Sequence, residues 1–333
     1  MATPLTGTVI ITGGNGSLGS EVALTIAKMQ PLVHLLLVAR DITHDESVHQ
    51  VAEKIRLIGP RSLEIVKLDL TSLEEVVVFA RHTVQRVLDR IIPPIVGLIN
   101  SAATLSFVDD GPTKDGFDPV YQVNCLAPFL LTVNLLEGFK MKGSIVLNIG
   151  CSAFSEGQLD YFDLHPPQGR STLSTREGKL RFGSSKLLMS AAMYALRRSL
   201  RHTARIPLNI CTLDPGVLAG ESHLARDLPT SVRVGQKTRR GLRPLVRMFS
   251  KTAINPAHVP AKVIAKLVFQ SDDRRWLDAE PYYILDDVYE ASSVLEVLRD
   301  GWKLDRIFEK VMRDAGLAGS STSSSGLSPS LTP

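Results

Sequence analysis

The sequence predicts an α/β fold in which one doubly wound parallel sheet is covered by helices on both faces, within a single domain. Three observations predict this fold. Short and almost continuous apolar runs recur along the chain, each is followed by a stretch long enough for a helix, and the first run ends in a glycine-rich turn. Strands without polar alternation are buried on both faces, and their alternation with helices is typical of parallel sheets.

The apolar runs set the expected order of the elements. Six strands, each followed by a helical segment, are expected at residues 8–12, 33–40, 63–70, 95–103, 144–150 and 207–216. A seventh strand at 281–285 and a closing helix at 292–316 complete the packing. We therefore predict one domain over residues 5–315, with a variable lid at about 220–256. The Ser/Thr-rich segment 317–333 has almost nothing to bury, so a disordered tail is expected there.

Composition narrows the functional class. With 44% hydrophobic and 22% charged residues the chain is typical of globular proteins. The net charge of +4 is small, and no basic patch interleaved with aromatic residues occurs, so nucleic acid is not an expected partner. Cys125, Cys151 and Cys211 are widely spaced and odd in number, which favours a reducing compartment over a disulfide framework and resembles no zinc site. We expect no metal.

The N-terminal residues predict a strand and not a targeting signal. The apolar run at 8–12 is short, follows no charged segment and ends in glycines, unlike a signal peptide. No apolar run reaches the roughly 18 residues of a transmembrane helix. A cytoplasmic protein is therefore expected.

The turn TGGNGSLG, residues 12–19, predicts a phosphate-binding site. Gly14, Gly16 and Gly19 satisfy the GxGxxG spacing and Gly13 precedes them. Glycines at such a turn allow a tight bend and close backbone approach, and the pyrophosphate then lies on the N-terminal amides of the helix, here at Ser17 and Leu18. A turn that is merely tight is the alternative interpretation. The position between a first strand and a helix favours the nucleotide.

Arg40 predicts which dinucleotide is bound. An acidic residue at the end of the second strand would bind an unphosphorylated ribose, whereas this strand ends in Arg40. A guanidinium suits a 2′-phosphate, so we expect NADP(H) as the cofactor. Asp41 follows immediately, and a solvated loop arginine is the alternative interpretation.

Six stretches in order carry a resemblance to the short-chain dehydrogenase/reductase family over about residues 7–290. They are TGGNGSLG, LDLTS with Asp69, LINSAA with Asn100, YQVNCLAPFLL with Asn124, FGSSK with Phe182 and Lys186, and LDPGVLAG with Pro215, Gly216 and Val217. In the family, Asp69 would contact the adenine ring, and the stretch from Pro215 to Val217 would meet the nicotinamide. The long segment SAFSEGQLDYFDL resembles the branch of retinol-dehydrogenase-like and fungal secondary-metabolism enzymes. The resemblance implies a Rossmann-type fold and a dinucleotide cofactor.

The catalytic motif of the family is incomplete in this chain. The resemblance implies that hydride passes between the nicotinamide and a carbonyl carbon while a tyrosine hydroxyl protonates the oxygen. Here Phe182 occupies the tyrosine position, and a phenyl ring has no proton to give. Lys186 lies four residues later on the same helix face and would contact the nicotinamide ribose, and Asn124 would take the structural and relay role. Loss of a positioned acid removes about 10²–10⁴ of rate.

Two further positions depart from the family pattern. The stretch IGCSA follows the fifth strand where the family carries a serine pair. We expect Ser152 in the role of the catalytic serine, with Cys151 as second choice, because a slip of one residue reverses the side a residue faces. Packing of both at a strand end is the alternative. Ser17 replaces the middle glycine of the shorter family branch, so the spacing fits Gly13, Gly16 and Gly19 of the extended branch.

Other aromatic and charged residues near the motif have competing interpretations. Tyr161, in the inserted segment, could replace the missing tyrosine, but a surface aromatic is the favoured interpretation. Tyr194 is expected in the core, and Lys179 and Arg181 are expected to be solvated. The basic segment 233–251 is expected to be a solvated lid helix, with peripheral membrane contact or binding of an acidic substrate as alternatives.

The resulting hypothesis is an NADP(H)-dependent oxidoreductase. Its substrate would be a carbonyl or alcohol of a hydrophobic small molecule, in keeping with secondary metabolism. A non-redox isomerase or cyclase and a nucleotide-binding pseudoenzyme are the alternatives, because of Phe182. The resemblance also implies a homodimer through helices around 115–140 and 180–203, in a branch that contains monomers as well.

Overall fold

The computed structural model of the chain describes most of the predicted domain. The described residues are 6–60, 62–140, 143–169, 171–201, 208–219, 254–269 and 281–318. The basic segment 233–251 lies outside them, as do most of the expected lid at 220–256 and most of the expected tail at 317–333.

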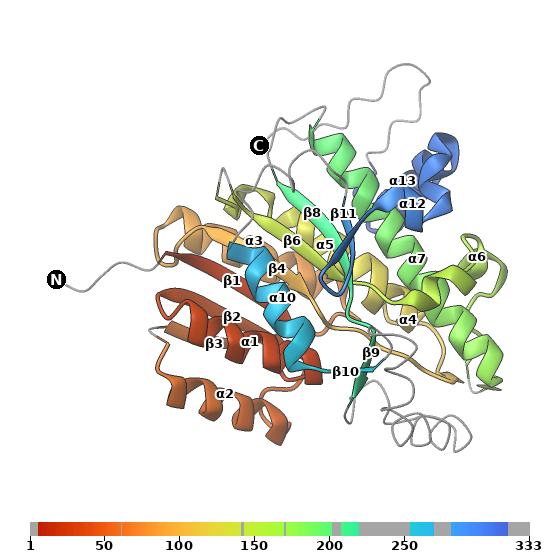
Figure 1. Cartoon of the computed structure of the whole chain (residues 1–333). Helices are drawn as coiled ribbons and strands as arrows, with labels where there is room; N and C mark the ends of the chain where they lie inside the picture. The colour runs from red at the N-terminus through yellow and green to blue at the C-terminus, as the bar shows by residue number, and fades with distance from the viewer. Residues whose placement is uncertain are drawn as a thin grey trace.

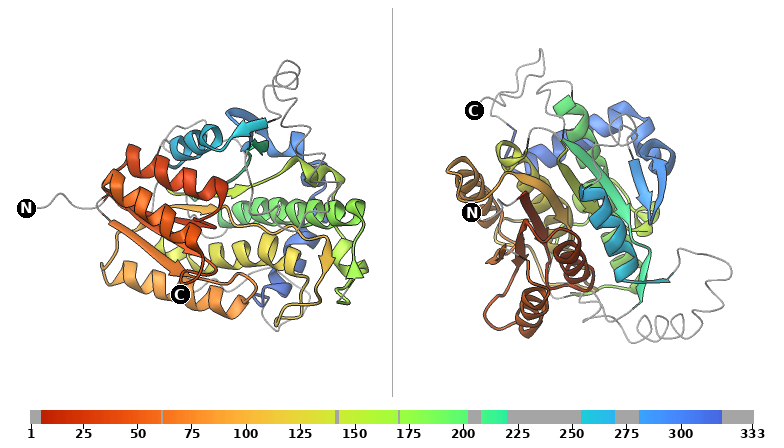
Figure 2. Two further views of the ribbon diagram at one scale, coloured as in Figure 1. Left: turned by 90° about the horizontal axis from the view of Figure 1, so that it is seen from below. Right: turned by 60° about the vertical axis from the view of Figure 1, so that its left-hand side comes forward.

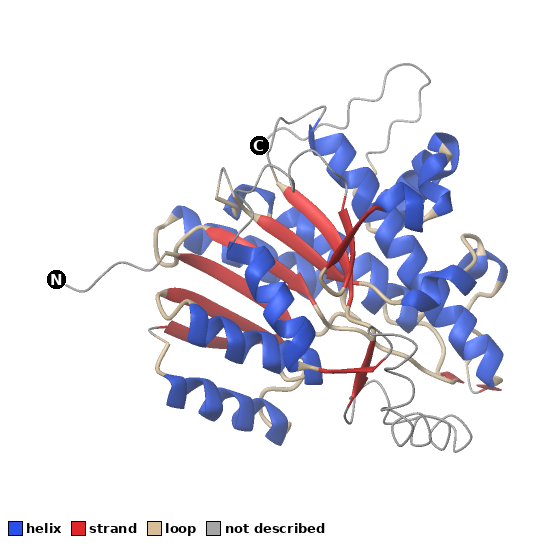
Figure 3. Ribbon diagram, viewed as in Figure 1, coloured by secondary structure: helices blue, strands red, loops and turns tan. Residues whose placement is uncertain are grey.

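An eight-stranded sheet forms the centre of the molecule (Figure 1, Figure 3). Its order is β12-β11-β8-β6-β4-β1-β2-β3, and every neighbouring pair is parallel except β11 and β12. The strands are β1 (Gly7–Thr12), β2 (Val33–Ala39), β3 (Ser62–Lys67), β4 (Ile95–Asn100), β6 (Ile145–Ile149), β8 (Asn209–Asp214), β11 (Pro281–Ile284) and β12 (Asp287–Glu290). The prediction of a doubly wound parallel sheet is thereby confirmed.

Helices cover both faces of the sheet because its strands are apolar on both sides (Figure 2). The two faces have separate cores. One face is packed by α1 (Ser17–Met29), α2 (Glu46–Ile58) and α10 (His258–Phe269). The other is packed by α3 (Leu73–Leu88), α5 (Ala127–Asn134) and α7 (Thr175–Ser199). Because helices cover both faces, a ligand can approach the sheet at the ends of its strands.

Short elements connect the main strands and helices of this frame. The short strand pairs are β5 (Val108–Asp109) with β7 (Ser171–Thr172) and β9 (Val217–Ala219) with β10 (Ile254–Pro256). The short helices are α4 (Pro119–Tyr121), the π-helical η1 (Gln122–Leu126), the 3-10 turns η2 (Leu136–Gly138), η3 (Ser152–Glu156) and η6 (Glu296–Arg299), α6 (Tyr161–Leu164) and α12 (Ala291–Val294). None of the helices in the described ranges combines the length and apolar character that crossing a bilayer requires.

The closing helix α13 (Gly301–Asp314) covers the face of α5 and α7. Its apolar stripe is buried, and its Phe308 ring meets Phe129 of α5 edge-on at 6.0 Å between centroids. The Tyr121 hydroxyl donates a hydrogen bond of 2.9 Å to Asp314 at the end of α13. Part of the surface on which we expected a homodimer is thus covered by a helix of the same chain, and the homodimer stays a prediction.

Candidate active site

The residues predicted to bind the cofactor and substrate come together at one edge of the sheet, where its parallel strands end. Ligands of open α/β sheets bind at this edge. The strands β1, β2, β3, β4, β6 and β8 end there beside Gly13, Arg40, Asp69, Asn100, Cys151 and Pro215, respectively. Six separate sequence stretches therefore contribute to one site.

Gly13 and Gly19 in the glycine turn lie too close to neighbouring atoms for a side chain to fit. Gly13 has a φ of +64°, and a Cβ placed on it would lie 2.9 Å from the Cα of Ala102 after β4. A Cβ on Gly19 would collide with the carbonyl oxygen of Gly13. These contacts hold the turn against the ends of β1 and β4, which gives the close helix–strand packing of a dinucleotide site.

The N-terminus of α1 is open toward this edge. Gly16 is the N-cap residue and provides no side-chain cap, and the first turn carries no acidic residue. Leu18 points into the core, whereas Ser17 is half-buried. A helix start without a capping side chain leaves amide donors and a positive dipole end, which suit a pyrophosphate. The residues present therefore fit a dinucleotide.

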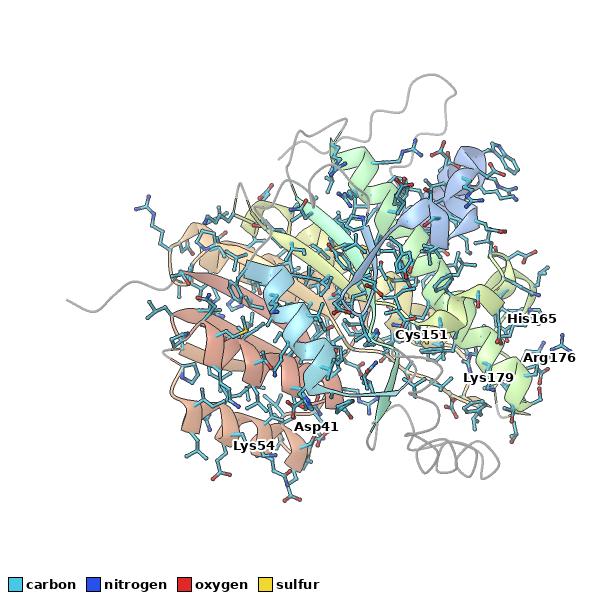
Figure 4. The ribbon with its side chains drawn as sticks, in the orientation of Figure 1. Asp41, Lys54, Cys151, His165, Arg176 and Lys179 are labelled. Atoms are coloured by element: carbon cyan, nitrogen blue, oxygen red, sulfur yellow. The ribbon has the colours of Figure 1, made fainter. Side chains whose placement is uncertain are left out.

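Arg40 and Asp41 both lie at the predicted ribose site. Arg40 is exposed directly after β2. The Asp41 carboxylate accepts the backbone N–H groups of Thr43 and His44, both at 2.9 Å, and these bonds lower its pKa. Figure 4 shows Asp41 at this edge, near the start of α2. Asp41 is thus held by its own loop, whereas the Arg40 side chain is exposed beside it.

Asp69 follows β3 and Asn100 ends β4 at the same edge. Asp69 accepts the backbone N–H and the hydroxyl of Thr71 at 2.9 and 2.8 Å. Asn100 donates to Asn148 on the neighbouring strand at 2.9 Å, and its buried Oδ1 has no hydrogen-bond partner among the described residues. A buried acceptor without a donor is costly, so a donor from a bound molecule or water is expected there.

The loop after β8 completes the edge on the opposite side. Gly216 has a φ of +69°, and its N–H donates to Asp214 at 2.8 Å. The Pro215 carbonyl accepts from Asn255 at 3.4 Å, which joins the loop to β10. Val217 begins β9 and is 45% exposed. The loop thus presents an apolar side chain and backbone groups to a ligand.

Lys186 on α7 is buried at the end of β6. Its Nζ donates a hydrogen bond of 2.9 Å to the carbonyl oxygen of Ile149, and the residue is only 3% exposed. Burial lowers the pKa of Lys186 to about 8, although the Cys151 thiol opposes this shift. The Phe182 ring centroid lies 5.8 Å from Nζ, so the predicted pair does share one helix face.

Asn124 ties the substrate side of the site to α7. Its Oδ1 accepts the N–H of Thr104 at 2.8 Å and its Nδ2 donates to the Thr104 carbonyl at 2.9 Å. The same Nδ2 donates to Ser185 at 3.0 Å, whose hydroxyl donates to the Phe182 carbonyl at 2.7 Å. Asn124 lies in the π-helical η1, a type of turn that is frequent at functional sites.

The structure brings Cys151, our second choice, together with Lys186, and leaves Ser152 exposed. Cys151 is half-buried as the N-cap of η3, and the positive charge of Lys186 acts on its thiol. Ser152 is the next residue, is exposed, and lowers the pKa of the Cys151 thiol. Figure 4 marks Cys151 at the end of β6. Because neighbouring residues at a strand end face opposite sides, the register of β6 favours the cysteine.

Tyr161 and Arg181 are placed differently from our expectations. Tyr161 is 5% exposed, so it is not a surface aromatic, and the largest charge effects on its hydroxyl come from Arg181 and Asp118. Arg181 is buried, not solvated: its Nε donates to Asp118 at 2.7 Å and its Nη1 donates to the Val108 carbonyl at 2.9 Å. The exposed Lys179 agrees with its prediction, as Figure 4 shows.

Two site residues escaped the sequence reasoning. Asp214 ends β8, and burial raises the pKa of its carboxyl group despite N–H bonds from Gly216 and Ser152. Tyr282 comes from β11 and is 1% exposed, and its hydroxyl has no hydrogen-bond partner among the described residues. Asp214 directly precedes Pro215 and Gly216 of the predicted cofactor loop, so its position in that motif could have identified it. No motif lies near Tyr282 in the sequence.

Comparison with known protein families agrees with this geometry. The family model for short chain dehydrogenases matches residues 7–158, which hold the glycine turn and the Cys151 strand end. The chain is 31% identical over 231 residues to the short-chain dehydrogenase iccH of Talaromyces variabilis, covering 68% of this chain and 59% of that protein. It is 34% identical over 161 residues to retinol dehydrogenase 13 of Mus musculus, covering 47% and 45%. The chain thus matches about half the length of these relatives.

Solved structures show the same fold at lower identity. The angucycline C-6 ketoreductase LanV with bound NADP superposes with a TM-score of 0.56 and 19% identity, over 83% of this chain and 93% of that chain. A metagenomic short-chain oxidoreductase in complex with NADP gives a TM-score of 0.52 and 18% identity, over 82% and 95%. Taken with the family model and the sequence relatives, the shared sheet order and the motif edge show that the chain belongs to the short-chain dehydrogenase/reductase family.

Proposed function

We propose that the protein is an NADP(H)-dependent oxidoreductase that acts on a carbonyl or alcohol group of a hydrophobic small molecule. The observation that carries the proposal is Lys186, a buried ammonium held at the end of β6 on the same edge as the open N-terminus of α1. A buried cation at this edge is costly unless it serves a partner, and a developing alkoxide is such a partner.

The residues of this edge would hold the dinucleotide. The turn from Gly13 to Gly19 would take the pyrophosphate, and Arg40 would take the 2′-phosphate. Asp69 and Asn100 would lie along the adenine and its ribose, and the loop from Pro215 to Val217 would meet the nicotinamide. When bound, NADPH supplies a hydride. The bound NADP in LanV and in the metagenomic oxidoreductase supports the choice of this cofactor.

The chain itself would position the reacting carbonyl. Lys186 would bind the ribose and add positive charge beside the carbonyl oxygen, which stabilises the alkoxide in the transition state. Asn124 holds the loop at Thr104 and α7 at Ser185, whose hydroxyl donates to the Phe182 carbonyl, so it ties these two elements together. Phe182 would pack against the substrate, because its ring carries no exchangeable proton.

The substrate class follows from the apolar lining and from the relatives. Val217 on the β8 loop is 45% exposed, and the mostly buried Phe182 ring lies 5.8 Å from Lys186 Nζ, so apolar side chains border this part of the edge. Relatives include a mouse polyprenol dehydrogenase, 31% identical over 218 residues, and a Streptomyces putative daunorubicin C-13 ketoreductase, 31% identical over 164 residues. These names support a hydrophobic alcohol or ketone and a place in secondary metabolism for this chain as well.

Replacement of Arg40 by alanine is expected to weaken NADPH binding by about 10- to 100-fold, because a charge-assisted bond to the 2′-phosphate is lost. NADH binding should stay unchanged, since NADH lacks that phosphate. Fluorescence titration of both cofactors against wild type and Arg40→Ala measures the two affinities. Lys54→Ala, on the exposed surface of α2, is the matched control. Equal weakening for both cofactors would contradict the assignment of Arg40.

Hydride transfer itself is tested with 4-deuterated NADPH and a panel of lipophilic ketones. We expect the deuterium to appear on the former carbonyl carbon with wild type protein, as mass spectrometry of the alcohol product reports. Phe182→Tyr should raise the rate by no more than about tenfold, because another group already supplies the proton. An inert wild type beside an active Phe182→Tyr variant would overturn the proposed function. A product of unchanged mass would point instead to isomerisation.

A further inference from the structure

Phe182 leaves the proposed reaction without the usual proton donor, so a different donor must face the carbonyl oxygen. Cys151 is the candidate for this donor. It follows β6 at the carboxyl edge, opposite the helix that carries Lys186 and Phe182. All three cysteines are free, and Cys125 and Cys211 are buried, whereas Cys151 is partly exposed. Cys151 is therefore the thiol that a substrate can reach.

Groups from each element around Cys151 act on its sulfur. Burial raises the pKa of the thiol, and the Asp214 carboxylate at the end of β8 adds to this rise. The Ala153 N–H and the Ser152 side chain within η3 lower the pKa of the thiol, and so does the Lys186 ammonium on α7. The thiol thus keeps its proton at neutral pH, while donors and a cation stand ready to stabilise the thiolate.

Tyr282 is an independent observation at the same place. Its hydroxyl is buried and has no hydrogen-bond partner among the described residues. A Cβ placed on Gly150 would lie 3.0 Å from Tyr282 Oη, so the hydroxyl borders the backbone directly before Cys151. Burial raises the pKa of this phenol, and the charges of Asp214 and Cys151 raise it further. A buried donor of this kind is expected to have a partner in some state of the site, and a thiolate would provide one.

We propose that Cys151 is the proton donor of the carbonyl reduction, in place of the missing tyrosine. The inference rests on the proposed function, which supplies the hydride to the carbonyl carbon. The S–H bond of Cys151 breaks and its electron pair stays on sulfur, while the carbonyl oxygen forms the O–H bond with the π electron pair displaced by the hydride. The Lys186 ammonium then returns a proton to the thiolate, and water reprotonates Lys186. Alcohol oxidation runs through the same steps in reverse.

The first test compares two substitutions of the thiol. Cys151→Ala should lower kcat for ketone reduction by about 10²–10³ with an unchanged Kd for NADPH. Cys151→Ser keeps a hydrogen-bond donor to the carbonyl but loses the acidic proton, so it should stay at least about tenfold below wild type. A serine variant as fast as wild type would reduce Cys151 to a positioning residue. Ser155→Ala, an exposed hydroxyl of the same turn, is the matched control and should retain full activity.

The second test measures the thiol without turnover. The rate of iodoacetamide alkylation at Cys151 is followed against pH by mass spectrometry, with buried Cys125 and Cys211 as internal controls. Lys186→Met should move the midpoint of alkylation to higher pH, because the thiolate loses its cation. Asp214→Asn should move it to lower pH, because a neighbouring negative charge is removed, and each shift should reach about one pH unit. Midpoints that stay in place in both variants would contradict the coupling.

The outcomes separate the two proposals. Deuterium transfer in wild type together with full activity of Cys151→Ala would leave the proposed function standing and overturn the role of Cys151. Absence of deuterium transfer in wild type overturns both. Transfer in wild type, its loss in Cys151→Ala and opposed alkylation shifts in the Lys186 and Asp214 variants together establish the cysteine as the acid.

Discussion

Lys186→Met is expected to slow carbonyl reduction by about 10³-fold, one of the two largest effects expected in this protein. Methionine fills a similar volume but carries no charge, so the alkoxide loses its cation and the Ile149 carbonyl loses its donor. The affinity for NADPH should fall as well, because the proposed ribose contact is lost. Steady-state kinetics with a lipophilic ketone and cofactor titration by fluorescence measure the two effects separately.

The pH dependence of the wild type gives a second readout of the same residue. Burial lowers the pKa of Lys186 to about 8, and the ammonium is the active form. The rate of reduction should therefore be full below this pKa and fall as the pH rises through about 8. The falling limb should vanish in Lys186→Met. Lys179→Met, on an exposed face of the same helix, should keep both the rate and the limb, and an equal loss there would contradict a specific role for Lys186.

Asp118→Ala is expected to lower the free energy of unfolding by about 3–5 kcal/mol. The substitution leaves the buried guanidinium of Arg181 without its carboxylate, and it also removes the acceptor of the Val120 and Tyr121 N–H groups at the start of α4. An uncompensated buried charge is among the most destabilising changes in a protein. Urea denaturation followed by circular dichroism measures the loss.

A double variant shows how much of that loss comes from the stranded charge. Asp118→Ala combined with Arg181→Met should recover part of the stability, since methionine needs no partner in the apolar surroundings. Lys303→Met breaks an exposed ion pair with Asp300 on α13 and should change the unfolding free energy by less than about 0.5 kcal/mol. A double variant as unstable as Asp118→Ala would show that the lost cap of α4 is the main cause.

Arg181 and Asp118 also connect stability to the site. Arg181 directly precedes Phe182, and Asp118 caps the segment that continues into η1 with Asn124. The pair therefore ties α7 next to Phe182 to the start of α4, just before Asn124. The sequence did not predict the Arg181–Asp118 pair. Lys179 and Arg181 lie near the start of a helix, where charged side chains are normally solvated. Only the packing of α4 and the β5 strand against α7 removes Arg181 from water.

The choice between Cys151 and Ser152 has a similar origin. The motif predicted Ser152 in the role of the catalytic serine, with Cys151 as second choice, since a shift of one residue exchanges the faces of a strand. Pairing of β6 with β4 and β8 sets the register through Ile149, and η3 begins at once. The result is a half-buried Cys151 and an exposed Ser152.

The sequence by itself determined the doubly wound sheet, the glycine turn, the dinucleotide edge and the family, because these depend on local periodicity, on turn chemistry and on the order of short motifs along the chain. The tertiary structure decided which groups act on one another: Lys186 and Asp214 shift the pKa of Cys151, Arg181 pairs with Asp118, and α13 packs on α5 and α7. The physical reason is that burial and charge pairing arise between segments far apart in sequence. Free energies of that kind depend on distance in space, which no single stretch of the chain records.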